Sequence, residues 1–198
     1  MFDIKDHLIV KDNFFKQKFL FKIHDELLKS VFVNRSVDYK ESVYQKIYFN
    51  ITLDNNHYAV QEVFKILNEE YKFNVGPLKS HYFLFCMSFI FNNSNYFLST
   101  KHEKATPHND KYDADGKEND NYFNCLIYLK GKPVLNSGTG FYDLDKKNNK
   151  FNLNRHVGFK ENRAILFDPR IFHASLQFTE GAGLRYVMAN FCKKIKKN

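Results

Sequence analysis

The sequence predicts an α+β fold that is mainly β, a jelly-roll barrel (a cupin-like double-stranded β-helix) with flanking N-terminal helices. Two amphipathic segments open the chain, and after residue 80 short aromatic and β-branched runs alternate with turn clusters. This order is typical of helices packed on the outside of a barrel. We predict a single domain over residues 1–198, with a helical support region at 1–79, a jelly-roll core at 80–193 and a basic tail at 194–198.

The first helix is predicted over residues 11–30. Apolar residues recur there at the three- and four-residue spacing of one helix face, and Asp12 or Asn13 is a suitable N-cap. The same spacing predicts a second helix over 57–71. The segment between them, 42–53, is predicted to be extended.

Eight short strands are predicted in the rest of the chain. Each run is rich in aromatic and β-branched residues and is bounded by Gly, Pro, Asn or Asp. The predicted strands lie at 81–91, 96–100, 105–110, 122–129, 139–144, 163–167, 170–175 and 183–192. Residues 111–121 and 145–162 are predicted to be loops.

The net charge of +8 raises the question of nucleic-acid binding. The positive charge comes almost entirely from lysine, because only five of the 30 basic residues are arginine. Lys, Asn, Phe, Ile and Tyr are abundant together, and all have AT-rich codons, so codon bias explains the basic composition. Nucleic acid is therefore not an expected partner, and the lysine-rich tail is interpreted as solvated.

Cysteine usage indicates a reducing environment. Cys86, Cys125 and Cys192 are odd in number, far apart and flanked by apolar residues, which predicts buried thiols and no disulfide framework. The N-terminus has no secretory signal, and no stretch approaches 18 apolar residues. We expect a cytoplasmic protein without a membrane anchor.

Three residues form a candidate metal site. His108 and Asp110 are two positions apart on a predicted strand, so their side chains point to the same face. His173 follows an apolar strand and a turn much later in the chain. Two histidines and one carboxylate cover one face of an octahedral Fe(II) and leave three positions open for other ligands.

Arg185 is an unusual residue for its surroundings. It lies in an apolar strand, where alternation places it on the same face as Val187, Ala189 and Phe191. A guanidinium on such a face needs an anion, because burying a charge without one costs several kcal/mol. The anion is either a fixed Asp or Glu of the protein or the carboxylate of a bound co-substrate.

These motifs resemble, in the same order, segments of the prolyl-hydroxylase-like Fe(II)- and 2-oxoglutarate-dependent oxygenases. The resemblance spans roughly residues 80–193 and rests on five segments together. Two positions differ from the family pattern: Ser137 replaces the first glycine of a Gly-Gly-Thr motif, and Val187 stands where many relatives have serine. The matching segments are 107–110, 124–130, 137–142, 163–173 and 183–185.

The resemblance implies a function. His108, Asp110 and His173 would hold Fe(II), 2-oxoglutarate would chelate the metal, and Arg185 would bind its distal carboxylate. Tyr128 is a candidate for a further contact to that carboxylate. The implied reaction is hydroxylation of a small molecule, an amino acid or a protein side chain, with release of succinate and CO2. Two alternatives remain open: a cupin-type metalloenzyme that does not use 2-oxoglutarate, and a non-enzymatic barrel that binds an acidic partner.

Overall fold

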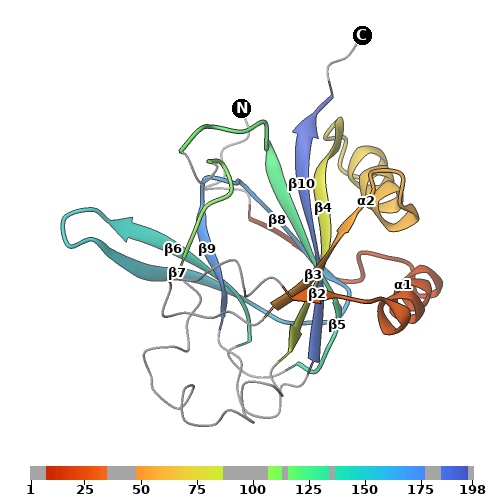
Figure 1. Ribbon diagram of the computed structural model, residues 1–198. Coiled ribbons are helices and arrows are strands. Elements are labelled where there is room, and N and C mark those ends of the chain that lie inside the picture. Colours follow the sequence, from red (N-terminus) through yellow and green to blue (C-terminus); the bar gives the residue numbers. More distant parts are fainter. Residues whose placement is uncertain are drawn as a thin grey trace.

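The computed structural model describes residues 8–34, 48–86, 107–112, 116–133, 137–176 and 184–195. In these parts of the chain, ten strands form two antiparallel sheets, and two helices accompany them. The helices lie together on one side of the larger sheet, and the hairpin of β6 and β7 projects on the other side (Figure 1).

Among the described residues, the larger sheet has seven strands and the smaller sheet has three. The larger sheet has the order β1-β8-β5-β10-β4-β3-β2, and the smaller one has the order β7-β6-β9. The strands of the larger sheet, in that order, are Ile9–Lys11, Arg163–Phe167, Phe123–Lys130, Leu184–Lys194, Val75–Cys86, Tyr48–Leu53 and Val33–Asn34. Those of the smaller sheet are Lys150–Gly158, Gly138–Asp145 and Phe172–Leu176.

One hydrophobic core joins the helices to the outer face of the larger sheet. Helix α1 (Gln17–Lys29) buries Leu20, Ile23 and Leu27, and helix α2 (Tyr58–Glu69) buries Val60, Val63, Phe64 and Leu67. These side chains form one cluster with β-strand residues such as Ile127 and Met188. The predicted packing of helices outside the sheets is therefore confirmed.

A second core fills the space between the two sheets. Tyr128, Ile165, Phe167 and Val187 of the larger sheet meet Phe141 and Val157 of the smaller sheet, with Phe159 beside them. Strand β10 shows the predicted alternation, because Tyr186 and Met188 belong to the outer core while Val187 belongs to this inner one.

The start of the first helix differs from its prediction. Residues 9–11 form β1, which pairs with β8, and α1 begins only at Gln17 after an N-cap, Lys16, that makes no side-chain capping bond. Asp12 is not the cap, because its carboxylate is bound by Arg163 and Lys160. Phe15, two residues before the helix, makes two hydrogen bonds with the side chain of Asn162. Its N–H donates to Oδ1, and its carbonyl accepts from Nδ2.

Strand β7 lies inside the predicted loop 145–162 and is the main element that the sequence prediction missed. Its residues 152–156 are all exposed, although Phe151, Leu153 and Val157 stand between polar residues in the sequence. Strand β4 begins at Val75, earlier than the predicted start at 81, because its first residues pair with the end of β10.

Several predictions concern residues outside the described parts of the chain. The predicted strand at 96–100 lies wholly outside them, as does the end of the predicted strand 81–91. Of the predicted strand 105–110, residues 107–110 are described, and they form a single bridge at His108 instead of a strand. Cys125 and Cys192 are buried free thiols, as predicted. Among the described residues, no helix has the length and apolar character needed to span a membrane.

Candidate metal centre

The backbone brings the two candidate histidine ligands together. His108 and His173 form an antiparallel bridge in which the His108 N–H donates to the His173 carbonyl (3.0 Å) and the His173 N–H to the His108 carbonyl (2.8 Å). Their imidazole rings lie side by side, with centroids 4.5 Å apart. The bridge extends the smaller sheet beyond β9, so the candidate site lies at an edge of that sheet.

Asp110 completes the group. It lies in a bend, not in the predicted strand, and its N–H donates to the carbonyl of Pro169 (2.8 Å). Its carboxylate lies 3.2 Å from Nε2 of His173 and 3.8 Å from Nε2 of His108. One potential ligand atom from each of the three residues lies within 4.8 Å of the others. This donor set, two imidazoles and a carboxylate, fits Fe(II) with open positions.

His173 is held in the orientation that a metal ligand needs. Its Nδ1 lies 3.1 Å from the carbonyl of Ile171, so Nδ1 carries the hydrogen and Nε2 is left as a lone-pair donor. The ring of Phe167 packs against the imidazole edge to face, at 4.7 Å between centroids. His173 is buried, whereas half of the His108 side chain is exposed, so the site opens to solvent on the His108 side.

Asp110 is held in its ionised form. Burial by itself raises the pKa of its carboxyl. In the metal-free protein, the hydrogen bond and charge of His173 in its protonated form, the charge of protonated His108 and the hydrogen bond from Asn124 together lower that pKa below the usual value. A carboxylate is the form that binds a cation. The electrostatics therefore favour a metal ligand at this position.

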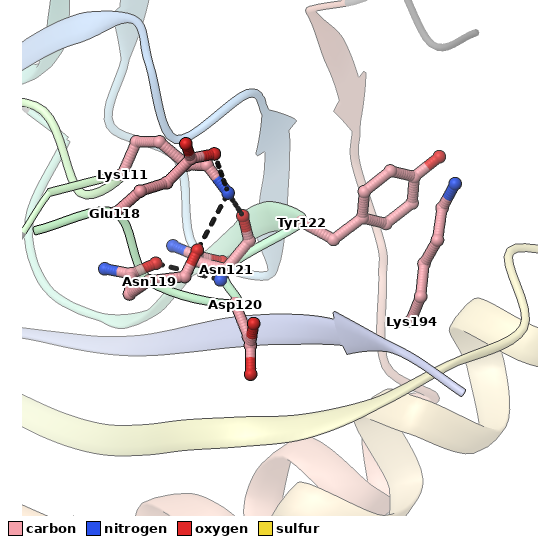
Figure 2. Close-up of a pocket in the computed structure, with 7 residues that line it drawn as sticks. All are labelled: Lys111, Glu118, Asn119, Asp120, Asn121, Tyr122 and Lys194. Atoms are coloured by element: carbon pink, nitrogen blue, oxygen red, sulfur yellow. Dashed lines mark hydrogen bonds and ion pairs between the residues drawn. The ribbon is translucent and has the colours of Figure 1, made fainter. Parts of the chain in front are cut away.

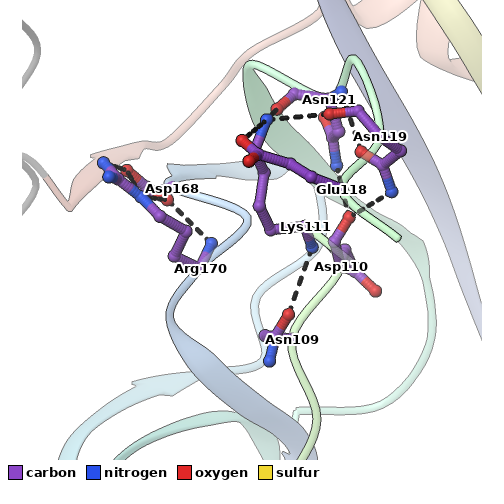
Figure 3. Close-up of polar contacts among 8 residues, drawn as sticks. All are labelled: Asn109, Asp110, Lys111, Glu118, Asn119, Asn121, Asp168 and Arg170. Carbon is purple, nitrogen blue, oxygen red and sulfur yellow. Dashed lines mark hydrogen bonds and ion pairs between the residues drawn. The ribbon is translucent and has the colours of Figure 1, made fainter. Parts of the chain in front are cut away.

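A network of amide side chains supports Asp110 from behind. Asn124, at the start of β5, donates from Nδ2 to Oδ2 of Asp110 (2.6 Å), and Asn121 donates from its own Nδ2 to Oδ1 of Asn124 (2.7 Å). The side chain of Asn119 donates to the Asp110 carbonyl (2.9 Å). Figure 3 shows Asn119 and Asn121, whose side chains both donate to the Asp110 carbonyl. We did not identify Asn124 as a site residue from the sequence, although an amide in the apolar run 123–129 was a signal.

The loop that carries Asp110 is also braced by Lys111. Its Nζ donates to the carbonyls of Asn119 (2.8 Å) and Asn121 (3.2 Å) and pairs with Glu118 (2.9 Å). A shallow surface hollow lies beside this brace, bordered at its far end by Tyr122 and Lys194 (Figure 2). None of the three candidate metal ligands lines this hollow.

Arg185 is buried on the inner face of the larger sheet. Only 4% of the residue is exposed, and its guanidinium lies 5.4 Å from the centre of the Phe159 ring. Burial lowers the pKa of this guanidinium to about 10. Gly131 makes room for it, because a Cβ at that glycine would stand 3.0 Å from the Phe159 ring and 3.3 Å from Cγ of Arg185. The positive charge is thus held at a desolvated position.

Tyr128 lies next to this arginine on the neighbouring strand. Its residue partner on β10 is Val187, two positions from Arg185, and its ring stacks on Phe159 at 4.7 Å between centroids. The phenol oxygen shares a hydrogen bond with Oγ1 of Thr139 (2.7 Å), and burial raises the pKa of Tyr128 to about 12. Tyr128, Phe159 and Phe167 belong to one inner core, and Phe167 contacts His173. The candidate co-substrate residues therefore face the same interior as the histidine.

Comparison of the structure with solved proteins places this arrangement in a known fold. A collagen prolyl hydroxylase from Paramecium bursaria Chlorella virus-1, in complex with 2-oxoglutarate, matches with a TM-score of 0.53 at 13% identity over 96% of this chain and 97% of its own. The chain has the prolyl-hydroxylase fold. No family model and no curated protein matches it in sequence.

Two further structures with the prolyl-hydroxylase fold were solved with ligands. A prolyl hydroxylase from Trichoplax adhaerens, in complex with a peptide of hypoxia inducible factor, matches at 14% identity with a TM-score of 0.57 over 94% of this chain and 83% of its own. HygX from Streptomyces hygroscopicus, with nickel, 2-oxoglutarate and hygromycin B bound, matches at 12% identity with a TM-score of 0.56. The match covers 94% of this chain and 82% of HygX. The predicted fold class is thereby confirmed.

Proposed function

We propose that the protein is an Fe(II)- and 2-oxoglutarate-dependent dioxygenase that hydroxylates its substrate. The observation that carries this proposal is the convergence of His108, Asp110 and His173, with ligand atoms within 4.8 Å, in a chain with the prolyl-hydroxylase fold. HygX was solved with nickel and 2-oxoglutarate bound, which supports a divalent metal together with 2-oxoglutarate here. When bound, Fe(II) and 2-oxoglutarate supply oxidation by O2, with release of succinate and CO2.

The roles of the residues follow from their positions. His108, Asp110 and His173 would hold the metal, and this set of three ligands would leave coordination positions for the co-substrate and O2. Arg185 binds the distal carboxylate of 2-oxoglutarate, since a guanidinium can grip a carboxylate with two parallel hydrogen bonds. Tyr128 supplies a hydroxyl beside it. The aromatic core around Phe159 and Phe167 keeps water away from this part of the site.

The substrate class is left broad in this proposal. Structures with this fold have been solved with a peptide and with hygromycin B, so the fold by itself does not select between a protein side chain and a small molecule. On the open side of the site stand His108 and the segment that carries Asp110. We expect the substrate to approach from that side.

The test is a screen of candidate substrates that measures succinate formed from 2-oxoglutarate with Fe(II) and O2. We expect succinate above the uncoupled background for at least one substrate, in a one-to-one ratio with a product heavier by one oxygen. His173→Ala protein serves as the control and should form none. Metal binding without any consumption of 2-oxoglutarate would indicate a cupin-type metalloenzyme of another kind. Failure to bind any metal would indicate a non-enzymatic barrel.

A further inference from the structure

The Asp110 carboxylate needs a partner that fixes its rotation. The torsion about Cβ–Cγ of an aspartate is broad, so position in the chain alone does not set the direction of the oxygens. The backbone N–H of Asp110 is anchored to Pro169, but this bond leaves the carboxylate free to turn. Nε2 of His173 lies 3.2 Å from Oδ2, but this nitrogen is itself a candidate metal ligand. The hydrogen bond from Asn124 to Oδ2, at 2.6 Å, restrains the carboxylate from outside the ligand set.

The direction of the Asn124 amide is itself determined. Its Oδ1 accepts a hydrogen bond from Nδ2 of Asn121, so its own Nδ2 must face Asp110. Asn121 and Asn124 are 1% and 5% exposed, and water therefore competes little for these bonds. Asn121 therefore donates to Asn124, and Asn124 donates to the Asp110 carboxylate.

We infer that Asn124 is a positioning residue for the metal, oriented by Asn121, which aligns the Asp110 carboxylate with the two imidazoles. This inference rests on the proposed function, because it concerns the same metal site. Asn124 acts through Asp110 and need not touch the metal. Residues that hydrogen-bond to metal ligands in this way typically change metal affinity by about 10- to 100-fold when they are replaced.

The experiment measures Ni2+ affinity by calorimetry, with Ni2+ as a redox-stable probe for Fe(II). We expect Asn124→Ala and the size-preserving Asn124→Leu each to weaken Ni2+ binding by about 10- to 100-fold. The matched control is Asn190→Ala. Asn190 is also buried in the larger sheet, directly opposite Cys125, but it binds Ser80 and the Cys125 carbonyl instead of a metal ligand. Asn190→Ala should leave the Ni2+ affinity unchanged.

A double-mutant cycle separates positioning from a general loss of structure. In Asp110→Ala protein, the two histidines should retain weak Ni2+ binding that high Ni2+ concentrations can measure, and adding Asn124→Ala should not weaken this residual binding further. An equal loss with and without Asp110 would overturn the inference, as would wild-type affinity in both Asn124 variants. If the wild-type protein itself fails to bind Ni2+, the proposed function fails first, and this outcome is distinct from the failure of the Asn124 role alone.

Discussion

His108 and His173 exchange both of their backbone hydrogen bonds, with N–O distances of 3.0 and 2.8 Å, and their rings stand 4.5 Å apart. Residues far apart in the chain are thus joined through the main chain, as a hydrogen-bonded antiparallel pair. The two imidazoles are brought together by the fold and do not depend on a bond between side chains. Metal binding should therefore require little rearrangement of this part of the structure.

The first prediction concerns the three ligands. His108→Ala, Asp110→Ala and His173→Ala should each lose Fe(II) binding, while the far-ultraviolet circular dichroism spectrum stays that of the wild type, because the backbone bridge remains. His156→Ala is the control, since His156 is an exposed histidine of the smaller sheet whose Nε2 contacts the carbonyl of Ser137. Wild-type Fe(II) affinity in any of the first three variants would remove that residue from the ligand set.

The second prediction concerns Arg185 and the co-substrate. Loss of a buried, two-pronged charge pair costs about 2–5 kcal/mol, so Arg185→Ala should raise the Kd for 2-oxoglutarate at least about tenfold. Arg185→Lys should restore part of the affinity. Calorimetry on Ni2+-loaded protein gives both the 2-oxoglutarate and the Ni2+ affinities, and the latter should not change.

Arg163→Ala is the matched control for Arg185. Arg163 lies on β8 and binds Asp12 and the carbonyl of Gly158, so its loss should lower the free energy of unfolding without affecting 2-oxoglutarate binding. An unchanged Kd for 2-oxoglutarate in Arg185→Ala, or an equal increase in both variants, would contradict the role given to Arg185.

The third prediction concerns Gly138, at the start of β6. Its φ is +138°, and a Cβ there would stand 2.1 Å from the carbonyl oxygen of Val157. Gly138→Ala should therefore lower the free energy of unfolding by about 1–3 kcal/mol from backbone strain, with a further loss from the clash. Urea denaturation measures this change. In Gly116→Ala, where φ is +77° but no atom lies within 4 Å of the Cβ, only the backbone strain should remain and the loss should be smaller.

The fourth prediction concerns pH. Hydrogen bonds from Arg163 and then Lys160 lower the pKa of Asp12 from 3.8 to about 2. A depressed carboxyl pKa stabilises the fold above the unfolded value, and this contribution is lost as pH falls from about 4 to about 2. Asp12→Asn should thus lose less stability than the wild type over this range. Because Asp12 is about one-third exposed, the difference should be at most about 1 kcal/mol.

Features with a local pattern could be predicted from the sequence. The apolar run in 163–167 predicted β8 with its observed bounds, and the spacing of apolar residues predicted both helices, although α1 begins later than expected. His108, Asp110 and His173 were identified by residue type and order, and the structure brings them together.

Features that depend on distant contacts could not be predicted. The start of α1 is displaced because Asn162 binds the backbone of Phe15, and no local pattern reveals this. Strand β7 is largely exposed and was taken for a loop. The role of Asn124 depends on the path of the loop that carries Asp110 and Asn121, which residue spacing does not determine.

The central claim is that one chain holds one metal ion and one 2-oxoglutarate in a single composite site. Anaerobic calorimetry tests it directly, first with Fe(II) and then with 2-oxoglutarate. We predict one Fe(II) per chain, followed by one 2-oxoglutarate that binds the metal-loaded protein and binds the metal-free protein far more weakly. Equal binding of 2-oxoglutarate with and without Fe(II), or no binding of Fe(II), would contradict the claim.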